Sequence, residues 1–211
     1  MKPVLFDFDG TLSDSGPIIT DCFMLTLKEE QGRDYPPEFF KPFIGPPLEE
    51  TFAHLGAEDP QRYIDTYRRH YFERMYATML FPGVAEMLER LDTAGVPMAV
   101  ATSKRRDAAL LLIRHLGIEE RFKVICGSQE ADPRGKKKHR VEDALSGLRK
   151  LGIDTEDAIM VGDRIHDIEG AAANGLETIL VLWGEAPQHE YARAWRTVET
   201  PGELERVLLS R

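Results

Sequence analysis

Residues 3–15 read PVLFDFDGTLSDS, and this stretch decides the fold. Its first part, Pro3–Phe8, is a short apolar run of strand-forming residues, so we predict a buried β-strand that ends in a turn. Side chains alternate along a strand, so Asp7 and Asp9 share one side at its carboxyl end. In an open parallel sheet that end faces the crevice where ligands bind. Crowded carboxylates repel each other, so the pair indicates a bound cation, and Mg²⁺ suits oxygen ligands.

Further short apolar runs follow, and they lack the polar alternation of half-exposed strands. We expect strands at 96–102, 122–126, 158–162 and 177–182. Unbroken apolar runs are typical of strands that helices cover on both faces. Apolar residues spaced as on one helix face lie between and after these runs, near 84–91, 108–115, 141–148 and 204–208. The alternation predicts an α/β fold, a Rossmann-like parallel sheet with helices on both faces.

Residues 15–80 interrupt this alternation, because they contain no convincing strand. Helical patterns occur at Ile18–Gln31, Pro47–Leu55 and Gln61–Met79. Segments with both Pro and Gly stand on either side of the insert, as is typical of domain boundaries. We therefore predict a core of residues 1–14 and 81–211 and a small all-helical domain of residues 15–80 inserted after the first strand.

Two other polar groups follow predicted strands. Asp163 and Asp167 lie in GDRIHD, residues 162–167, and Thr102, Ser103 and Lys104 follow the apolar residues Pro97–Ala101. Taken alone, Asp163 or Thr102 is also the kind of residue that caps a helix. Strand ends of one parallel sheet share an edge, however, so we expect Asp163 and Asp167 to complete a metal site with Asp7 and Asp9. A hydroxyl and free N–H groups at a helix start are suited to bind a phosphate oxygen.

A basic run, GKKKHR at residues 135–140, precedes the helix expected from Val141. A lysine there would neutralise an aspartate and a phosphate together. The run by itself is also typical of a solvated loop. Three candidates, Lys136, Lys137 and Lys138, compete for this position.

Composition limits the partners. The 211 residues carry 27 Lys and Arg against 36 Asp and Glu, a formal net charge of −9. This balance argues against a protein that wraps nucleic acid or lies on an anionic membrane. Two distant cysteines exclude a disulfide scaffold, Asp7 interrupts the first apolar run, and no run approaches the about 20 residues of a membrane span. We expect a cytoplasmic protein; the sequence does not predict its oligomeric state.

The order of these motifs resembles the haloacid dehalogenase superfamily: DxDGTLxDS, a Thr after a strand, a Lys before a helix, then GDxxxD. The helical insert is similar to the cap domain of the phosphoglycolate-phosphatase-like subfamily, and FIGPPL at residues 43–48 is similar to its specificity loop. The lysine motif departs from many relatives because no Pro follows any of its lysines. The resemblance implies a Mg²⁺-dependent phosphatase for a small phosphorylated metabolite, with the cap closing over the site.

The resemblance also assigns roles residue by residue. Asp7 would be the nucleophile that forms an aspartyl-phosphate, and Asp9 the general acid and then base, whose carbonyl also ligates the metal. The resemblance favours Lys138 as the lysine on the nucleophile. Phosphate- and substrate-binding residues would be Thr102, Gly10, Ser103, Lys104, Gly45 and Pro46. Metal ligands would be Asp7, Asp9, Asp163 and Asp167.

Three alternatives stay open at this point. A phosphomutase or a pyrophosphatase would use the same core. A non-catalytic phosphate-binding or interaction module is an alternative of another class, against which the intact acidic motifs argue.

Overall fold

The computed structural model describes residues 1–129, 134, 136–184 and 186–211. The chain divides into two compact units, Met1–Asp14 with Leu80–Arg211, and Ser15–Met79. The insert therefore ends one residue before the predicted position. Gly135 of the basic run lies outside the described residues.

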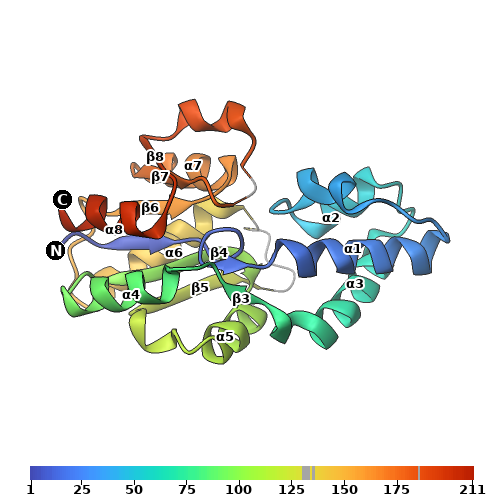
Figure 1. The fold of residues 1–211 in the computed structure, drawn as a ribbon, viewed down its shortest axis with the longest axis horizontal. Coiled ribbons are helices and arrows are strands. Elements are labelled where there is room, and N and C mark those ends of the chain that lie inside the picture. Colours follow the sequence, from blue (N-terminus) through green and yellow to red (C-terminus); the bar gives the residue numbers. More distant parts are fainter. Residues whose placement is uncertain (130–133, 135, 185) are drawn as a thin grey trace. The chain divides into compact units, whose positions relative to one another are not determined.

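A six-stranded parallel sheet forms the centre of the first unit, in the order β5-β4-β1-β6-β7-β8 (Figure 1). The strands are β1 (Val4–Phe6), β4 (Met98–Arg105), β5 (Val124–Ser128), β6 (Ile159–Gly162), β7 (Glu177–Val181) and β8 (Arg196–Val198). The predicted parallel sheet is thus confirmed. Strand β8 was not predicted from the sequence, because its three residues, Arg-Thr-Val, contain a single apolar side chain.

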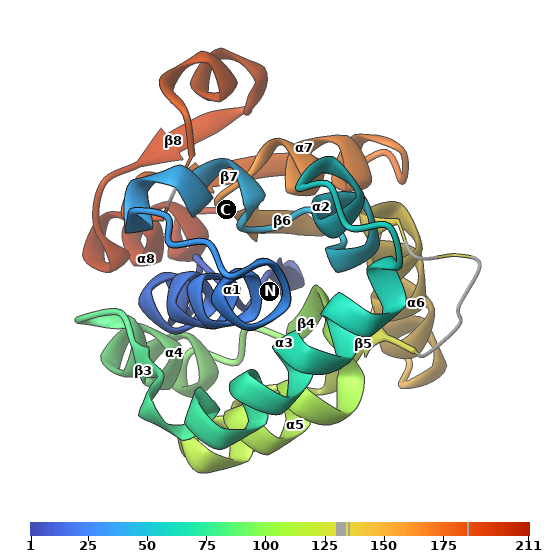
Figure 2. The same ribbon diagram turned by 90° about the vertical axis from the view of Figure 1, so that its right-hand side faces the viewer.

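Helices cover both faces of this sheet. They are α4 (Val84–Thr93), α5 (Arg106–His115), α6 (Lys137–Lys150), α7 (Ile165–Ala172) and α8 (Pro201–Leu209). Figure 1 shows α4 and α8 in front of the strands and α6 behind them, and the turned view in Figure 2 agrees. Residues Leu5, Ala99, Ala101 and Met160 of the strands pack with the apolar stripe of α6 in one buried cluster. Short 3-10 turns, η3 (Glu119–Arg121) and η4 (Gln188–Arg193), lie in the connections.

The second unit is helical and has its own core. Its elements are α1 (Gly16–Gln31), η1 (Pro37–Phe43), α2 (Leu48–His54), α3 (Pro60–Arg74) and η2 (Met75–Ala77). Phe23 on α1 lies at the centre of an aromatic group, with its ring 5.6 Å from Phe40 and Phe52 and 4.9 Å from Tyr67. The predicted third helix ends earlier than expected, because Met79 belongs to β3 (Met79–Leu80), which pairs with β2 (Ser13–Asp14). Across the described residues, no helix has both the length and the hydropathy of a membrane span.

Candidate active site

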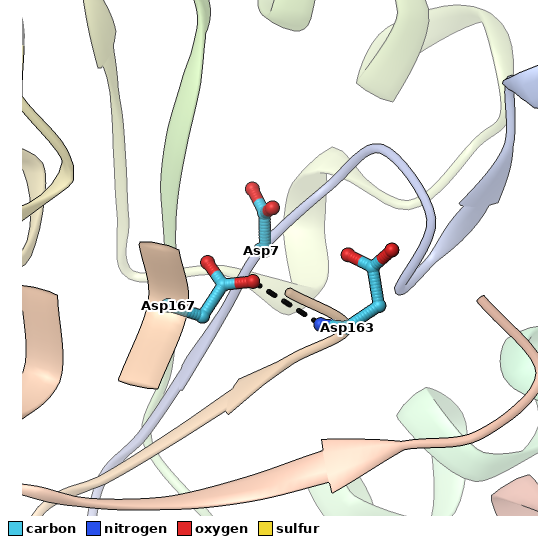
Figure 3. A group of neighbouring side chains, drawn as sticks. All are labelled: Asp7, Asp163 and Asp167. Carbon is cyan, nitrogen blue, oxygen red and sulfur yellow. Dashed lines mark hydrogen bonds between the residues drawn. The ribbon is translucent and has the colours of Figure 1, made fainter. Parts of the chain in front are cut away.

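Three carboxylates meet at the carboxyl edge of the sheet (Figure 3). Asp7 follows β1, Asp163 follows β6, and Asp167 lies in the first turn of α7. One oxygen from each lies within 4.8 Å of the others. The backbone fixes this arrangement, because the Asp7 N–H donates to the carbonyl of Val161 in the neighbouring strand at 2.8 Å.

Asp167 organises the turn that carries Asp163. Its Oδ2 accepts the backbone N–H groups of Asp163 and Arg164, each at 3.1 Å. A side chain that satisfies two otherwise free N–H groups at a helix start stabilises that turn. The other face of Asp163 is closed by Gly10, whose φ is +78° and where a Cβ would lie 2.2 Å from Asp163 Oδ2. Only glycine fits that close approach with that backbone conformation.

Lys137 joins two of the three aspartates. Its Nζ lies 2.7 Å from Asp7 Oδ1 and 2.6 Å from Asp167 Oδ1, and the Lys137 side chain is only 5% exposed. The side chain lies against Gly170 of α7, where a Cβ would come within 2.8 Å of it. The predicted lysine was Lys138, and the structure places Lys137 there instead, because Lys137 starts the buried face of α6. The Lys138 side chain is exposed.

Burial and charge act against each other on these groups. Burial raises the pKa of Asp7 to about 7, with Lys137 opposing the rise and Asp167 adding to it. Burial alone would lower the pKa of Lys137, but the charges of Asp167 and Asp7 outweigh it and raise that pKa. The lysine therefore stays charged, whereas the Asp7 carboxyl group takes up a proton near neutral pH.

Asp9 has a different partner from the other aspartates. Both of its carboxylate oxygens lie 3.0 Å from Lys104 Nζ, and the Lys104 side chain is 9% exposed. Lys104 reaches Asp9 from an irregular part of β4, where the pairing with β5 shifts register between Ala101 and Arg105. Thr102 in the same segment is buried, and its Oγ1 accepts the Lys104 N–H at 3.1 Å. Such bulges are common beside active sites because they redirect side chains.

The remaining predicted residues fall in two places. Ser103 is half-buried in the β4 segment next to Thr102. Gly45 and Pro46 lie in the helical unit between η1 and α2, so their predicted role in substrate binding stays a prediction.

Trp183 follows β7 and contacts the first aspartate loop. The Trp183 Nε1–H donates to the Thr11 carbonyl at 2.9 Å, next to the Asp9-Gly10 turn. Glu190 was not predicted, and it accepts the backbone N–H of Ile165 at 2.7 Å. No motif marks Glu190, because its partner lies 25 residues away in the chain.

The family model for haloacid dehalogenase-like hydrolases matches residues 4–181, which include all of these aspartates and lysines. The chain belongs to this family. The chain is 41% identical over 183 residues to tyrosine-protein kinase PtkA of Mycobacterium tuberculosis, covering 86% of this chain and 62% of that protein. It therefore spans less than two thirds of that relative. It is 36% identical over 193 residues to a 5'-nucleotidase of Pseudomonas aeruginosa, covering 89% and 85% of the two chains.

Solved structures agree with this membership. A predicted phosphatase from Clostridium acetobutylicum superposes with a TM-score of 0.90 at 30% identity, over 100% of this chain and 99% of that one. The Rossmann-like fold and the family predicted from the motif order are both confirmed.

Proposed function

We propose that this haloacid dehalogenase-like hydrolase is a Mg²⁺-dependent phosphatase for small phosphate monoesters, with Asp7 as the nucleophile. The observation that carries the proposal is the grouping of Asp7 with Asp163 and Asp167 beside the buried ammonium of Lys137. Phosphatase and nucleotidase relatives support the same chemistry.

The carboxylate group fits a magnesium ion. When all three carboxylates are ionised, they leave two negative charges against one ammonium in a largely buried place, which a divalent cation would match. Carboxylate oxygens are the ligands that Mg²⁺ prefers, and Asp7, Asp163 and Asp167 would hold it. The predicted ligation by Asp9 would use its carbonyl, since its carboxylate is paired with Lys104. A bound Mg²⁺ supplies charge that reduces repulsion between the phosphate and Asp7.

The chain's own residues divide the work of phosphoryl transfer. Asp7 Oδ attacks phosphorus, the bond to the leaving oxygen breaks, and an aspartyl-phosphate forms. Lys137 holds Asp7 in position and screens its charge against the incoming phosphate. Asp9 protonates the leaving oxygen and then takes a proton from the water that hydrolyses the intermediate. Thr102 and Ser103 donate hydrogen bonds to the transferred group.

Lys104 places a second positive charge at the leaving-group side. An ammonium within 3.0 Å of both Asp9 oxygens would be near any oxygen that Asp9 protonates. This supports substrates that carry a further anionic group close to the phosphate, and Lys104 would then bind that group when Asp9 binds the leaving oxygen.

Phosphoryl transfer to a tyrosine hydroxyl is a second candidate, favoured by the 41% identity with the M. tuberculosis kinase. The same aspartyl-phosphate would form, and Asp9 would remove the proton of the tyrosine instead of that of a water. The two candidates differ in the acceptor, and the kinase would also take its phosphoryl group from ATP instead of from a phosphate monoester.

Phosphate release from p-nitrophenyl phosphate, with Mg²⁺ and with EDTA, tests the proposal. We expect Mg²⁺-dependent release that Asp7→Asn abolishes. Asp157→Asn is the matched control for Asp7→Asn. Asp157 is exposed and precedes strand β6, whereas Asp7 follows strand β1, so the two aspartates lie at opposite ends of neighbouring parallel strands. Wild-type release no greater than that of Asp7→Asn would contradict the phosphatase.

A substrate panel then separates the acceptors and the alternatives. It contains phosphoglycolate, 5'-nucleotides, sugar phosphates, pyrophosphate and phosphotyrosine, and a parallel reaction offers ATP with a tyrosine peptide. Labelled phosphotyrosine without free phosphate would favour the kinase, and an isomerised sugar phosphate would favour a mutase.

A further inference from the structure

The segment that follows β7 returns to the two aspartate loops, although it lies beyond residue 181, where the family match ends. Trp183 hydrogen-bonds the Thr11 carbonyl. Gly184 lies so close to Asp163 that a Cβ there would be 2.4 Å from the Asp163 Cβ and 2.6 Å from the Gly10 carbonyl oxygen. Trp183 and Gly184 thus pack directly on both loops.

Glu190 is a charged residue of this segment that lies in the interior. It lies on η4 and is only 3% exposed. Its Oε2 accepts the Ile165 N–H at 2.7 Å and lies 3.6 Å from the Nε of the buried Arg164. A buried carboxylate is costly unless it is paired and hydrogen-bonded. Here the positive end of α7 and the Arg164 guanidinium provide both.

Glu190 completes the support of the turn that carries Asp163. Three successive backbone N–H groups, those of residues 163, 164 and 165, point to carboxylates. Asp167 takes the first two and Glu190 takes the third. Asp167 is itself held by Lys137, so Glu190 is the support that comes from outside the motif residues.

We propose that Glu190 is a positioning residue for the metal site, acting on Asp163 through the backbone of residues 163–165. The inference rests on the proposed magnesium site. Loss of Glu190 leaves the Ile165 N–H and Arg164 without this carboxylate, so the turn gains freedom and the position of Asp163 relative to Asp7 is held by fewer contacts. Partners in the outer shell of a metal site typically change metal affinity by about 10- to 100-fold.

Isothermal titration with Mg²⁺ alone tests the inference on the whole chain. We expect Glu190→Ala to weaken Mg²⁺ binding by about 10-fold. Glu190→Gln keeps an oxygen acceptor for Ile165 and should recover most of the affinity. Arg193→Ala is the matched control, because Arg193 also joins η4 to α7, through an exposed ion pair of 3.1 Å with Glu169. We expect its affinity to stay at the wild-type value.

Amide hydrogen exchange in metal-free protein gives a second readout. Exchange at residues 163–166 should rise in Glu190→Ala and stay unchanged in Arg193→Ala. A folded Glu190→Ala with wild-type Mg²⁺ affinity and unchanged exchange would overturn the inference. If Glu190→Ala does not fold, Glu190→Asp replaces it, since its shorter side chain draws the carboxylate away from Ile165. Wild-type affinity in Glu190→Asp would then overturn the inference.

The two proposals fail in different ways. A wild type that neither binds Mg²⁺ nor releases phosphate contradicts the proposed function, whatever the exchange shows. A wild type that binds Mg²⁺ as tightly as its folded Glu190 variants contradicts only the positioning role.

Discussion

The buried aspartate site of the sheet unit and the interior of the helical unit of residues 15–79 are built from different kinds of side chain. In the sheet unit, Lys137 and Asp167 are almost fully buried, and the Lys137 ammonium forms ion pairs with both Asp167 and Asp7. In the helical unit, aromatic rings around Phe23 fill the interior, and the ion pair between Glu29 and Arg69 lies at the surface with both side chains nearly half exposed.

The buried aromatic rings contribute to stability, whereas the buried charges serve the proposed activity. Burial of aromatic rings away from water lowers the free energy of the folded state, so the residues that the helical unit buries stabilise it. Charges lose hydration on burial, and their mutual attraction only partly offsets this loss. The buried charges of the sheet unit therefore indicate a functional site. Substitutions there should lower activity without lowering the free energy of unfolding to the same degree, and some should raise it.

Of the substitutions that test this comparison, Lys137→Met should have the largest effect, and the effect is on phosphate release. It leaves Asp7 and Asp167 without their shared ammonium, so we expect phosphate release to fall by about 10³-fold, as for the loss of one preorganised electrostatic group. Lys138→Met is the matched control, one residue along and exposed, and should keep wild-type release. Equal losses in the two variants, measured at saturating Mg²⁺, would contradict the assignment of Lys137.

Phe23→Ala tests the helical unit. Removing a buried ring that contacts three other rings should lower the free energy of unfolding by about 3 kcal/mol, measured by urea denaturation. Arg69→Ala removes an exposed partner of Glu29 and should leave the unfolding midpoint almost unchanged. If Arg69→Ala lowered the free energy of unfolding as much as Phe23→Ala, the contrast between buried rings and charged pairs would be refuted.

Asp7→Asn should have a smaller effect, and one of opposite sign, on stability. The pKa of Asp7 is about 7 in the folded protein against 3.8 as the ordinary value, so the folded state binds a proton more tightly than the unfolded chain. Wild-type stability is therefore lost as the pH rises from about 4 through 7. One pKa unit corresponds to about 1.4 kcal/mol, so this loss is at most a few kcal/mol.

The measurement is thermal unfolding in EDTA at pH 5 and pH 8. Asp7→Asn lacks the titrating group, so it should be more stable than the wild type at pH 8, with a difference that shrinks at pH 5. If Asp7→Asn were destabilised equally at pH 5 and pH 8, burial would not disfavour the ionised form of Asp7.

The sequence alone predicts the sheet, the helical insert and the acidic residues of the site, because these follow from local patterns. Strand residues show their burial as unbroken apolar runs; Asp7 and Asp163 each stand at or just after the end of such a run, and Asp167 follows Asp163 by four residues. Once the strands are parallel, their carboxyl ends share an edge, so the meeting of these aspartates needs no further information.

Only the tertiary structure decides which lysine and which further residues reach that edge. The spacing of residues in α6 favours Lys137. It precedes the buried Val141 by four residues and the buried Ala144 by seven, so it lies on the same helix face. The pairing of Lys104 with Asp9 depends on an irregular strand pairing, and the Glu190 contact depends on a turn that returns across 25 residues. Such contacts join side chains through packing between distant segments, and no local period of the sequence records them.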